Sequence, residues 1–125
     1  MQEREIKDNR ILSLTLEFSV DILKYCEELS SKKKFVLSDQ LCRSGTSIGA
    51  NIWEAQNAES KYDFIHKFKI AAKEVEETQY WLILCKRVFR EAIIDRLIEK
   101  LSEINRIVTS IIATSKRRVK RRKVG

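Results

Sequence analysis

Apolar residues recur at steps of three and four along most of the chain, the spacing that places side chains on one face of an α-helix. The clearest run covers residues 60–89, where Phe64, Phe68 and later positions alternate these steps across nearly four heptads. Ser60 and Asp63 fit a capping box at its start, with the Asp63 carboxylate placed to reach back to the cap's own N–H. This segment is therefore predicted to be a long helix.

Three further helices follow from the same spacing. Residues 11–29 carry two neighbouring apolar stripes, residues 91–115 carry one, and a helix over residues 38–57 takes Ser38 as its N-cap. Connections of about 3 to 8 residues between such helices favour antiparallel neighbours. The sequence predicts one all-α domain over residues 1–115, an antiparallel up-down-up-down four-helix bundle. An extended coiled coil is the alternative, which the short segments disfavour.

The composition agrees with a helical domain. The 125 residues include no proline and only three glycines, whereas β-hairpins need turn residues at regular intervals. Hydrophobic residues make up 43% of the chain, enough for a core that needs no disulfide or metal.

Charge is divided unevenly along the chain. The formal net charge is +7, and residues 1–115 hold 18 basic and 18 acidic residues. The excess lies in residues 116–125, which have no acidic residue and which we expect to form a flexible C-terminal arm that contacts phosphates. Its bases are Lys116, Arg117, Arg118, Lys120, Arg121, Arg122 and Lys123. A solubilising tail is the alternative interpretation.

Residues that commonly carry chemistry are few. The one histidine, His66, follows Asp63 by three positions, but a second carboxylate–histidine pair for a di-iron site is absent from the sequence. Cys26, Cys42 and Cys85 lie in three different helical segments without metal-ligand spacing and are interpreted as reduced core residues. We expect no enzymatic activity, metal, cofactor or small-molecule substrate.

Neither a membrane segment nor a secretory signal is expected. The longest uncharged run, residues 44–53, is about half of the ~20 residues that span a bilayer, and the first ten residues are rich in charge. These features predict a soluble cytoplasmic protein.

Two patterns in residues 38–57 concern packing. Gly45 and Gly49 lie one turn apart, and each costs about 1 kcal/mol in a helix relative to alanine, so we expect another helix to approach closely there. Beside the apolar stripe runs a polar one, matched by polar and aromatic positions in residues 60–89. Its predicted members are Gln40, Arg43, Ser47, Asn51, Glu54, Glu74, Glu77, Tyr80 and Trp81, with Lys67 on the same line. These side chains form either a hydrogen-bonded network, within or between subunits, or a solvated helix face.

Residues 38–82 resemble the four-helix bundle proteins encoded by intervening sequences of bacterial 23S ribosomal RNA genes, sometimes labelled a ribosomal protein family. The resemblance is carried by Gln40, Arg43-Ser44, Ser47-Ile48, Asn51-Ile52, Glu54-Ala55, Phe64, Lys67, Ala71, Lys73-Glu74, Glu77 and Tyr80-Trp81-Leu82. It implies a non-catalytic bundle that assembles as a homopentamer. It also implies a relation to the accessory variability determinant protein of diversity-generating retroelements, a nucleic-acid-binding pentamer that partners a reverse transcriptase.

The resemblance favours a structural network for the polar stripe, since its members are the matching positions, and a subunit interface for the second apolar stripe of residues 11–29. Two functions remain open. The first is an oligomer that binds RNA or DNA through phosphate contacts of the arm. The alternative is a scaffold whose main partner is another protein, such as a reverse transcriptase.

Overall fold

Every helix expected from the apolar spacing is present, together with one short helix that the spacing does not indicate. The structure is a computed structural model that describes residues 1–124, with side chains through Lys123. The described part is all-helical, as predicted. Its helices are α1 (Glu3–Asp8), α2 (Arg10–Ser31), α3 (Phe35–Ala55), α4 (Lys61–Phe89) and α5 (Ala92–Val124).

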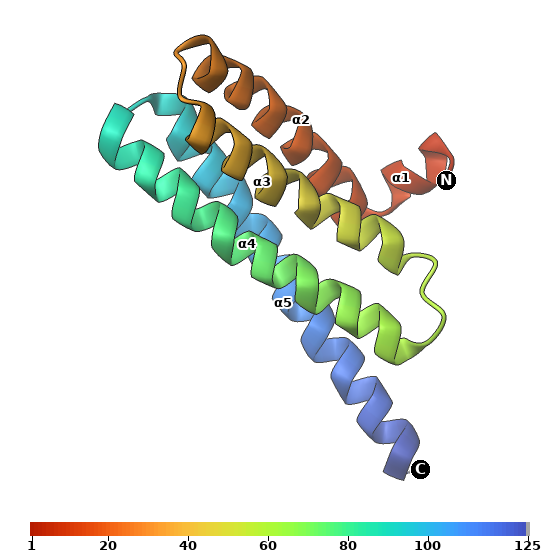
Figure 1. The fold of residues 1–125 in the computed structure, drawn as a ribbon. Coiled ribbons are helices and arrows are strands. Elements are labelled where there is room, and N and C mark those ends of the chain that lie inside the picture. Colours follow the sequence, from red (N-terminus) through yellow and green to blue (C-terminus); the bar gives the residue numbers. More distant parts are fainter. Residues whose placement is uncertain (125) are drawn as a thin grey trace.

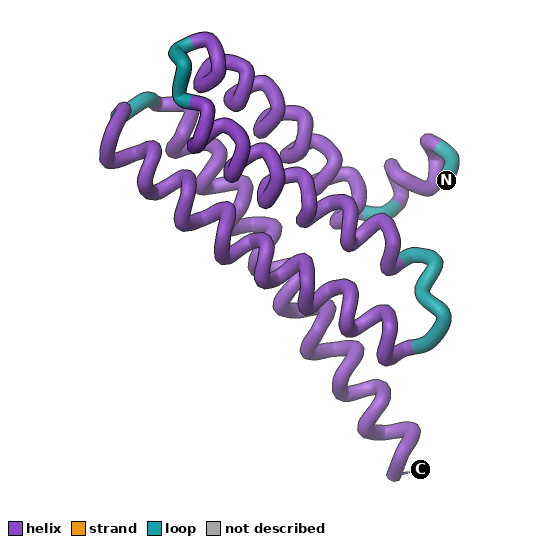
Figure 2. Tube along the Cα trace, viewed as in Figure 1, coloured by secondary structure: helices purple, strands orange, loops and turns teal. Residues whose placement is uncertain are grey.

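The four long helices lie side by side, each against two neighbours (Figure 1). Helix α2 contacts α3 and α5, and α4 contacts the same two helices. The loops between α2 and α3 and between α4 and α5 lie at one end of the molecule, and the loop between α3 and α4 lies at the other (Figure 2). The short α1 packs on α2 only, beside the latter end.

The core is built from the predicted apolar stripes. Phe18 of α2, Leu41 of α3, Phe68 of α4 and Ile104 of α5 are all fully buried. Each such side chain contributes about 1.5–3 kcal/mol on removal from water. Among the described residues, none of the helices combines the length and the apolar character needed to cross a membrane.

The start of α3 differs from the prediction. The helix begins at Phe35 and not after Ser38, because Lys33 adopts a left-handed conformation (φ 61°) that reverses the chain within three residues. Ser38 is then one turn inside the helix and 5% exposed. Its hydroxyl donates to the Cys26 carbonyl oxygen at 2.9 Å and also bonds the Ser30 hydroxyl at 2.8 Å. Ser38 thus joins α3 to α2.

Both ends of α4 are set by local hydrogen bonds. The Ser60 hydroxyl oxygen accepts from the Asp63 N–H at 3.0 Å, which confirms the predicted cap. The Asp63 carboxylate accepts from the Glu59 N–H at 3.2 Å. The expected donor is the N–H of the next residue, Ser60. At the other end Arg90 is left-handed (φ 54°), and its N–H donates to the Lys86 carbonyl oxygen. The helix therefore ends at the predicted Phe89.

Helix α5 continues nine residues beyond the boundary expected at 115. Residues 116–124 of the expected flexible arm are its last turns, and residue 125 of that arm lies outside the described residues. Residues 92–124 contain neither glycine nor proline, so no residue in them interrupts a helix. Lysine and arginine are also good helix formers, and their positive charges interact favourably with the negative end of the helix dipole. Figure 1 shows these turns extending past the loop between α3 and α4.

Candidate nucleic-acid interface

The last turns of α5 carry a dense set of cations. We call residues 116–123 the basic extension; all seven of its basic side chains are exposed, and Val119, its one apolar residue, is half-buried. Within the described part of the chain, none of the seven lies within ion-pair distance of a carboxylate, whereas the bundle's Arg10, Lys86 and Lys100 each have an acidic partner. The extension therefore presents charge that the protein itself does not neutralise.

A contact between Lys123 and Tyr62 joins the extension to the start of α4. The Lys123 ammonium lies 5.3 Å from the centroid of the Tyr62 ring, a cation–π contact. Interaction with the Tyr62 side chain also raises the pKa of Lys123, so this group keeps its charge. Arg117 donates a hydrogen bond to Thr114 at 3.4 Å.

A groove lined by both polar and apolar residues adjoins the extension at the same end of the bundle. It encloses about 340 Å³, and Arg118 and Lys61 are the cations on its lining. Asn9 and Gln56 also line it and are joined by a hydrogen bond of 3.3 Å. No acidic side chain belongs to the described lining of this groove. Lys61 thus adds one cation of the bundle beside the extension.

The predicted polar stripe is a surface network between α3 and α4. Arg43 pairs with Glu77, lies 3.6 Å from Glu74, and donates to Gln40 at 3.3 Å. Half of the Arg43 side chain is exposed. These ion pairs form within one chain, and their exposure gives them the modest strength of solvent-screened pairs.

The remaining stripe residues divide into three kinds. Lys67 pairs with Glu54 at 3.0 Å, which is a second link between α4 and α3. Ser47 and Asn51 bond backbone carbonyls of their own helix, at Arg43 and Ser47 respectively. The Tyr80 and Trp81 rings meet edge to face at 5.0 Å. The Glu74 Oε2 and Trp81 Nε1 atoms are buried and have no hydrogen-bond partner among the described residues.

One buried polar contact between α3 and α4 lies outside the predicted set. The Thr78 hydroxyl donates to Ser44 Oγ at 3.0 Å, and both residues are fully buried. Thr78 occupies a position of the apolar stripe, and Ser44 lies beside Gly45. The sequence contains a signal for this bond, because Ser44 and Thr78 are small hydroxyl residues on the apolar sides of neighbouring helices.

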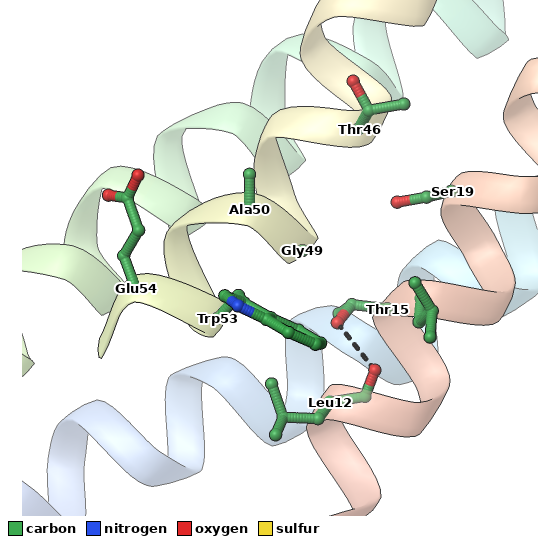
Figure 3. Close-up of a pocket in the computed structure, with 9 residues that line it drawn as sticks. Leu12, Thr15, Ser19, Thr46, Gly49, Ala50, Trp53 and Glu54 are labelled. Carbon is green, nitrogen blue, oxygen red and sulfur yellow. Dashed lines mark hydrogen bonds between the residues drawn. The ribbon is translucent and has the colours of Figure 1, made fainter. Parts of the chain in front are cut away.

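A second surface feature lies between α2 and α3. Trp53, Gly49 and Thr46 of α3 face Leu12, Thr15 and Ser19 of α2 across a shallow groove of about 340 Å³ (Figure 3). The predicted second stripe of α2 continues from this groove as three exposed apolar residues, Leu16, Val20 and Leu23, each between 44% and 48% exposed. We call this groove and stripe the α2 face; Leu16 belongs to both, and the described part of the chain leaves its exposed apolar residues uncovered.

The predicted close approach of another helix to the α3 glycines involves α2 and occurs at Gly45. A Cβ added at Gly45 would come within 2.9 Å of an Ile22 methyl carbon, so this position requires glycine for close packing. A Cβ at Gly49 would meet Ser19 and Thr15 only at 3.4 Å, an ordinary contact distance. Close approach therefore depends on Gly45, while Gly49 opens onto the α2 face.

Residues of possible catalytic or metal-binding use are not brought together in the described chain. No group of three or more histidine, cysteine or acidic side chains is arranged to hold a metal ion there. His66 is exposed on α4. Burial raises the pKa of Cys26 to about 12 and also raises the pKa of Cys85, so neither is a reactive thiolate at neutral pH.

Comparisons with known proteins give one family. The family model described as 23S rRNA-intervening sequence protein matches residues 7–110. A crystal structure of a protein of unknown function from the S23 ribosomal protein family of Bacteroides thetaiotaomicron is 44% identical in sequence, with a TM-score of 0.78. The match covers 82% of this chain and 97% of that one. No curated protein matches the chain.

Proposed function

The chain belongs to the 23S rRNA-intervening sequence protein family, and from that premise we propose that it is a non-catalytic, cytoplasmic protein that binds RNA or DNA through phosphate contacts. The subunit is an antiparallel up-down-up-down four-helix bundle, and the assembly is a homopentamer. The observation that carries the binding proposal is the basic extension, whose seven cations are exposed and lack acidic partners among the described residues. Its charge attracts polyanions without any further rearrangement of the fold.

The family match alone does not supply the extension. The matched region ends at residue 110, so the basic extension lies beyond it. The bundle of residues 1–115 is formally neutral and offers no net attraction for phosphates. Phosphate binding is therefore a property that we assign to the extension of this chain, with Lys61 of the adjoining groove as a neighbouring cation.

A salt titration tests the binding proposal. If all seven cations contacted phosphates, the log–log slope of affinity against salt would be about −6 on duplex and about −5 on single strands. A variant that removes four of these charges should make the duplex slope less steep, by about 3 to 4. Its substitutions are Lys120→Gln, Arg121→Gln, Arg122→Gln and Lys123→Gln.

A matched control removes the same charge from the bundle. Its substitutions fall on exposed side chains that have no acidic partner among the described residues: Lys24→Gln, Lys69→Gln, Lys73→Gln and Arg87→Gln. The control should keep the wild-type slope. Equal slopes for both quadruple variants would contradict the assignment of binding to the extension.

The α2 face supports self-association. A ring of identical subunits joins two different surfaces of each chain, and the apolar face on α2 supplies one of them. The exposed Tyr80 and Ile83 of α4 supply an apolar surface elsewhere on the bundle. Light scattering of the full chain at micromolar concentration should give the mass of five subunits. A monomeric mass would overturn the oligomer.

The alternative function is a scaffold with a protein partner such as a reverse transcriptase, for which the α2 face would be the docking surface. The two functions differ in what the isolated protein does. An oligomeric full-length protein that binds neither RNA nor DNA at 50 mM salt would favour the scaffold. Salt-sensitive binding that is lost with the charges of the extension favours the nucleic-acid-binding protein.

A further inference from the structure

The basic extension is a helix, and its charges surround that helix. At about 100° per residue, the seven cations cover every side except a narrow one at Val119. The Val119 side continues the bundle-facing line of Ile112 and Ser115, both half-buried. Of the cations on the other sides, Lys123 contacts the Tyr62 ring of α4, and Figure 1 shows the backbone of these last turns extending past the start of α4.

The distribution of cations around the helix favours one class of anionic partner over the others. A helix that lies on a membrane needs an apolar face, and residues 116–123 have one apolar residue. Single-stranded nucleic acid is held by stacking on aromatic side chains, and the extension has none. A flat acidic protein surface would neutralise only one side of the helix. A groove with phosphates on both walls neutralises cations on opposite sides at once.

We propose that the basic extension inserts as a helix into the major groove of B-form duplex DNA, and that the nucleic acid bound by this protein is therefore duplex DNA in preference to duplex RNA. This inference rests on the proposed function and names its substrate class. The major groove of B-form DNA is about 12 Å wide, which admits a helix of about 10–12 Å diameter. The major groove of A-form RNA is too deep and narrow to admit one.

The length and the charge of the basic extension also match those of a segment of duplex DNA. Eight helical residues span about 12 Å. Duplex DNA carries about one phosphate charge per 1.7 Å of its axis, or about seven over that length, as many as the cations of the extension. The last acidic residue of the chain is Glu103, so the part of α5 nearest the groove adds no repulsion.

The first experiment compares two duplexes of one 20-base-pair sequence, one of DNA and one of RNA, by fluorescence anisotropy at 100 mM salt with the full chain. We expect the DNA duplex to bind at least tenfold more tightly. Dimethyl sulfate footprinting should show protection of guanine N7, which lies in the major groove. Equal affinity for the two duplexes, or no protection at N7, overturns the inference.

The second experiment separates a helix from a flexible charged segment. Val119→Pro keeps all seven cations but interrupts the helix in the middle of the extension, because proline removes a backbone hydrogen bond and clashes with the preceding turn. Val119→Ala is the matched control that keeps the helix. We expect Val119→Pro to lose tenfold or more in DNA affinity and to keep RNA affinity within about twofold, with Val119→Ala close to wild type. Wild-type DNA affinity in Val119→Pro overturns the inference.

The outcomes also distinguish the inference from the proposed function. If both duplexes bind equally and the charge variants still lower the salt slope, the extension binds phosphates but not as a groove-inserted helix. If neither duplex binds at 50 mM salt, the proposed function itself fails. Position 119 lies outside the buried core, and the melting temperature of each variant checks that the bundle is intact.

Discussion

At the scale of single residues, two neighbouring positions of α3 make polar contacts that differ in burial. The Thr78 hydroxyl and Ser44 Oγ satisfy each other in the interface of α3 and α4, where both residues are fully buried. Arg43, which precedes Ser44, is half exposed and pairs with Glu77, whose side chain is 40% exposed. Neighbours in sequence thus contribute to stability by different amounts, because burial decides what a lost hydrogen bond costs.

Substitution of Ser44 and Arg43 should therefore give opposite results. Ser44→Ala leaves the Thr78 hydroxyl buried without a partner, which should cost about 1–3 kcal/mol in the free energy of unfolding. Arg43→Ala removes exposed ion pairs and should cost at most about 1 kcal/mol. Urea unfolding of both variants measures the difference. A larger loss for Arg43→Ala would mean that the polar stripe is buried, for example in a subunit interface.

The buried thiols predict an alkaline limit of stability. Burial raises the pKa of Cys26 from 9.0 to about 12, so the folded state keeps the proton that the unfolded state loses above pH 9. Protonated Cys26 therefore favours the folded state fully below pH 9. As the pH rises from 9 toward 12, the free energy of unfolding falls by up to about 1.4 kcal/mol for each pH unit. Urea midpoints at pH 7.5, 9 and 10 should fall less steeply in Cys26→Ala than in the wild type. Parallel curves would refute this assignment.

At the scale of elements, α2 and α3 pack closely at one point and separate at another. The Ile22 side chain fills the space beside Gly45, whereas the groove of the α2 face opens beside Gly49. Helix propensity is the same for both glycines, so the difference comes from the neighbouring helix alone. The same interface therefore contains a tight contact and an open surface within one turn of α3.

Alanine substitutions at Gly45 and Gly49 should separate the effect of close packing from that of helix propensity. Gly45→Ala gains about 1 kcal/mol of helix propensity but overpacks against a fully buried Ile22, at a cost of about 1–3 kcal/mol. Gly49→Ala gains the propensity without a clash and should be neutral or more stable than the wild type by up to about 1 kcal/mol. Thermal melting ranks the two variants. A Gly45→Ala protein more stable than Gly49→Ala would contradict the close packing.

At the scale of the whole molecule, charge and apolar surface are segregated. The positive excess lies at one end, on the basic extension, and the uncovered apolar residues of the α2 face lie along the side of the bundle (Figure 1). Assembly through the α2 face would bring several extensions into one particle. The combined affinity for a polyanion would then exceed that of a single chain by multivalency.

Charges introduced on the α2 face should prevent that assembly. The double variant Leu16→Glu and Val20→Glu places carboxylates on two half-exposed apolar positions of α2 without entering the core. We expect a smaller mass by light scattering and a melting temperature that no longer rises with protein concentration. Val36→Glu, at a position that is 74% exposed near the loop between α2 and α3, is the control and should keep the wild-type mass. An unchanged mass in the double variant would show that assembly uses another surface.

The sequence by itself determined the four long helices and the division of charge. Steps of three and four located the long helices, Ser60 marked the start of α4, and the count of charges placed the excess beyond residue 115. These features are local, because periodicity, capping and composition act between residues a few positions apart.

Only the tertiary structure decided the features that depend on contacts between distant residues. It placed Ser38 against Cys26 and not at a helix start, joined Thr78 to Ser44, and left Arg43 at the surface. A periodic pattern gives the face on which a side chain lies, but its burial and partner depend on which helix packs there, and that is settled only when the whole bundle assembles.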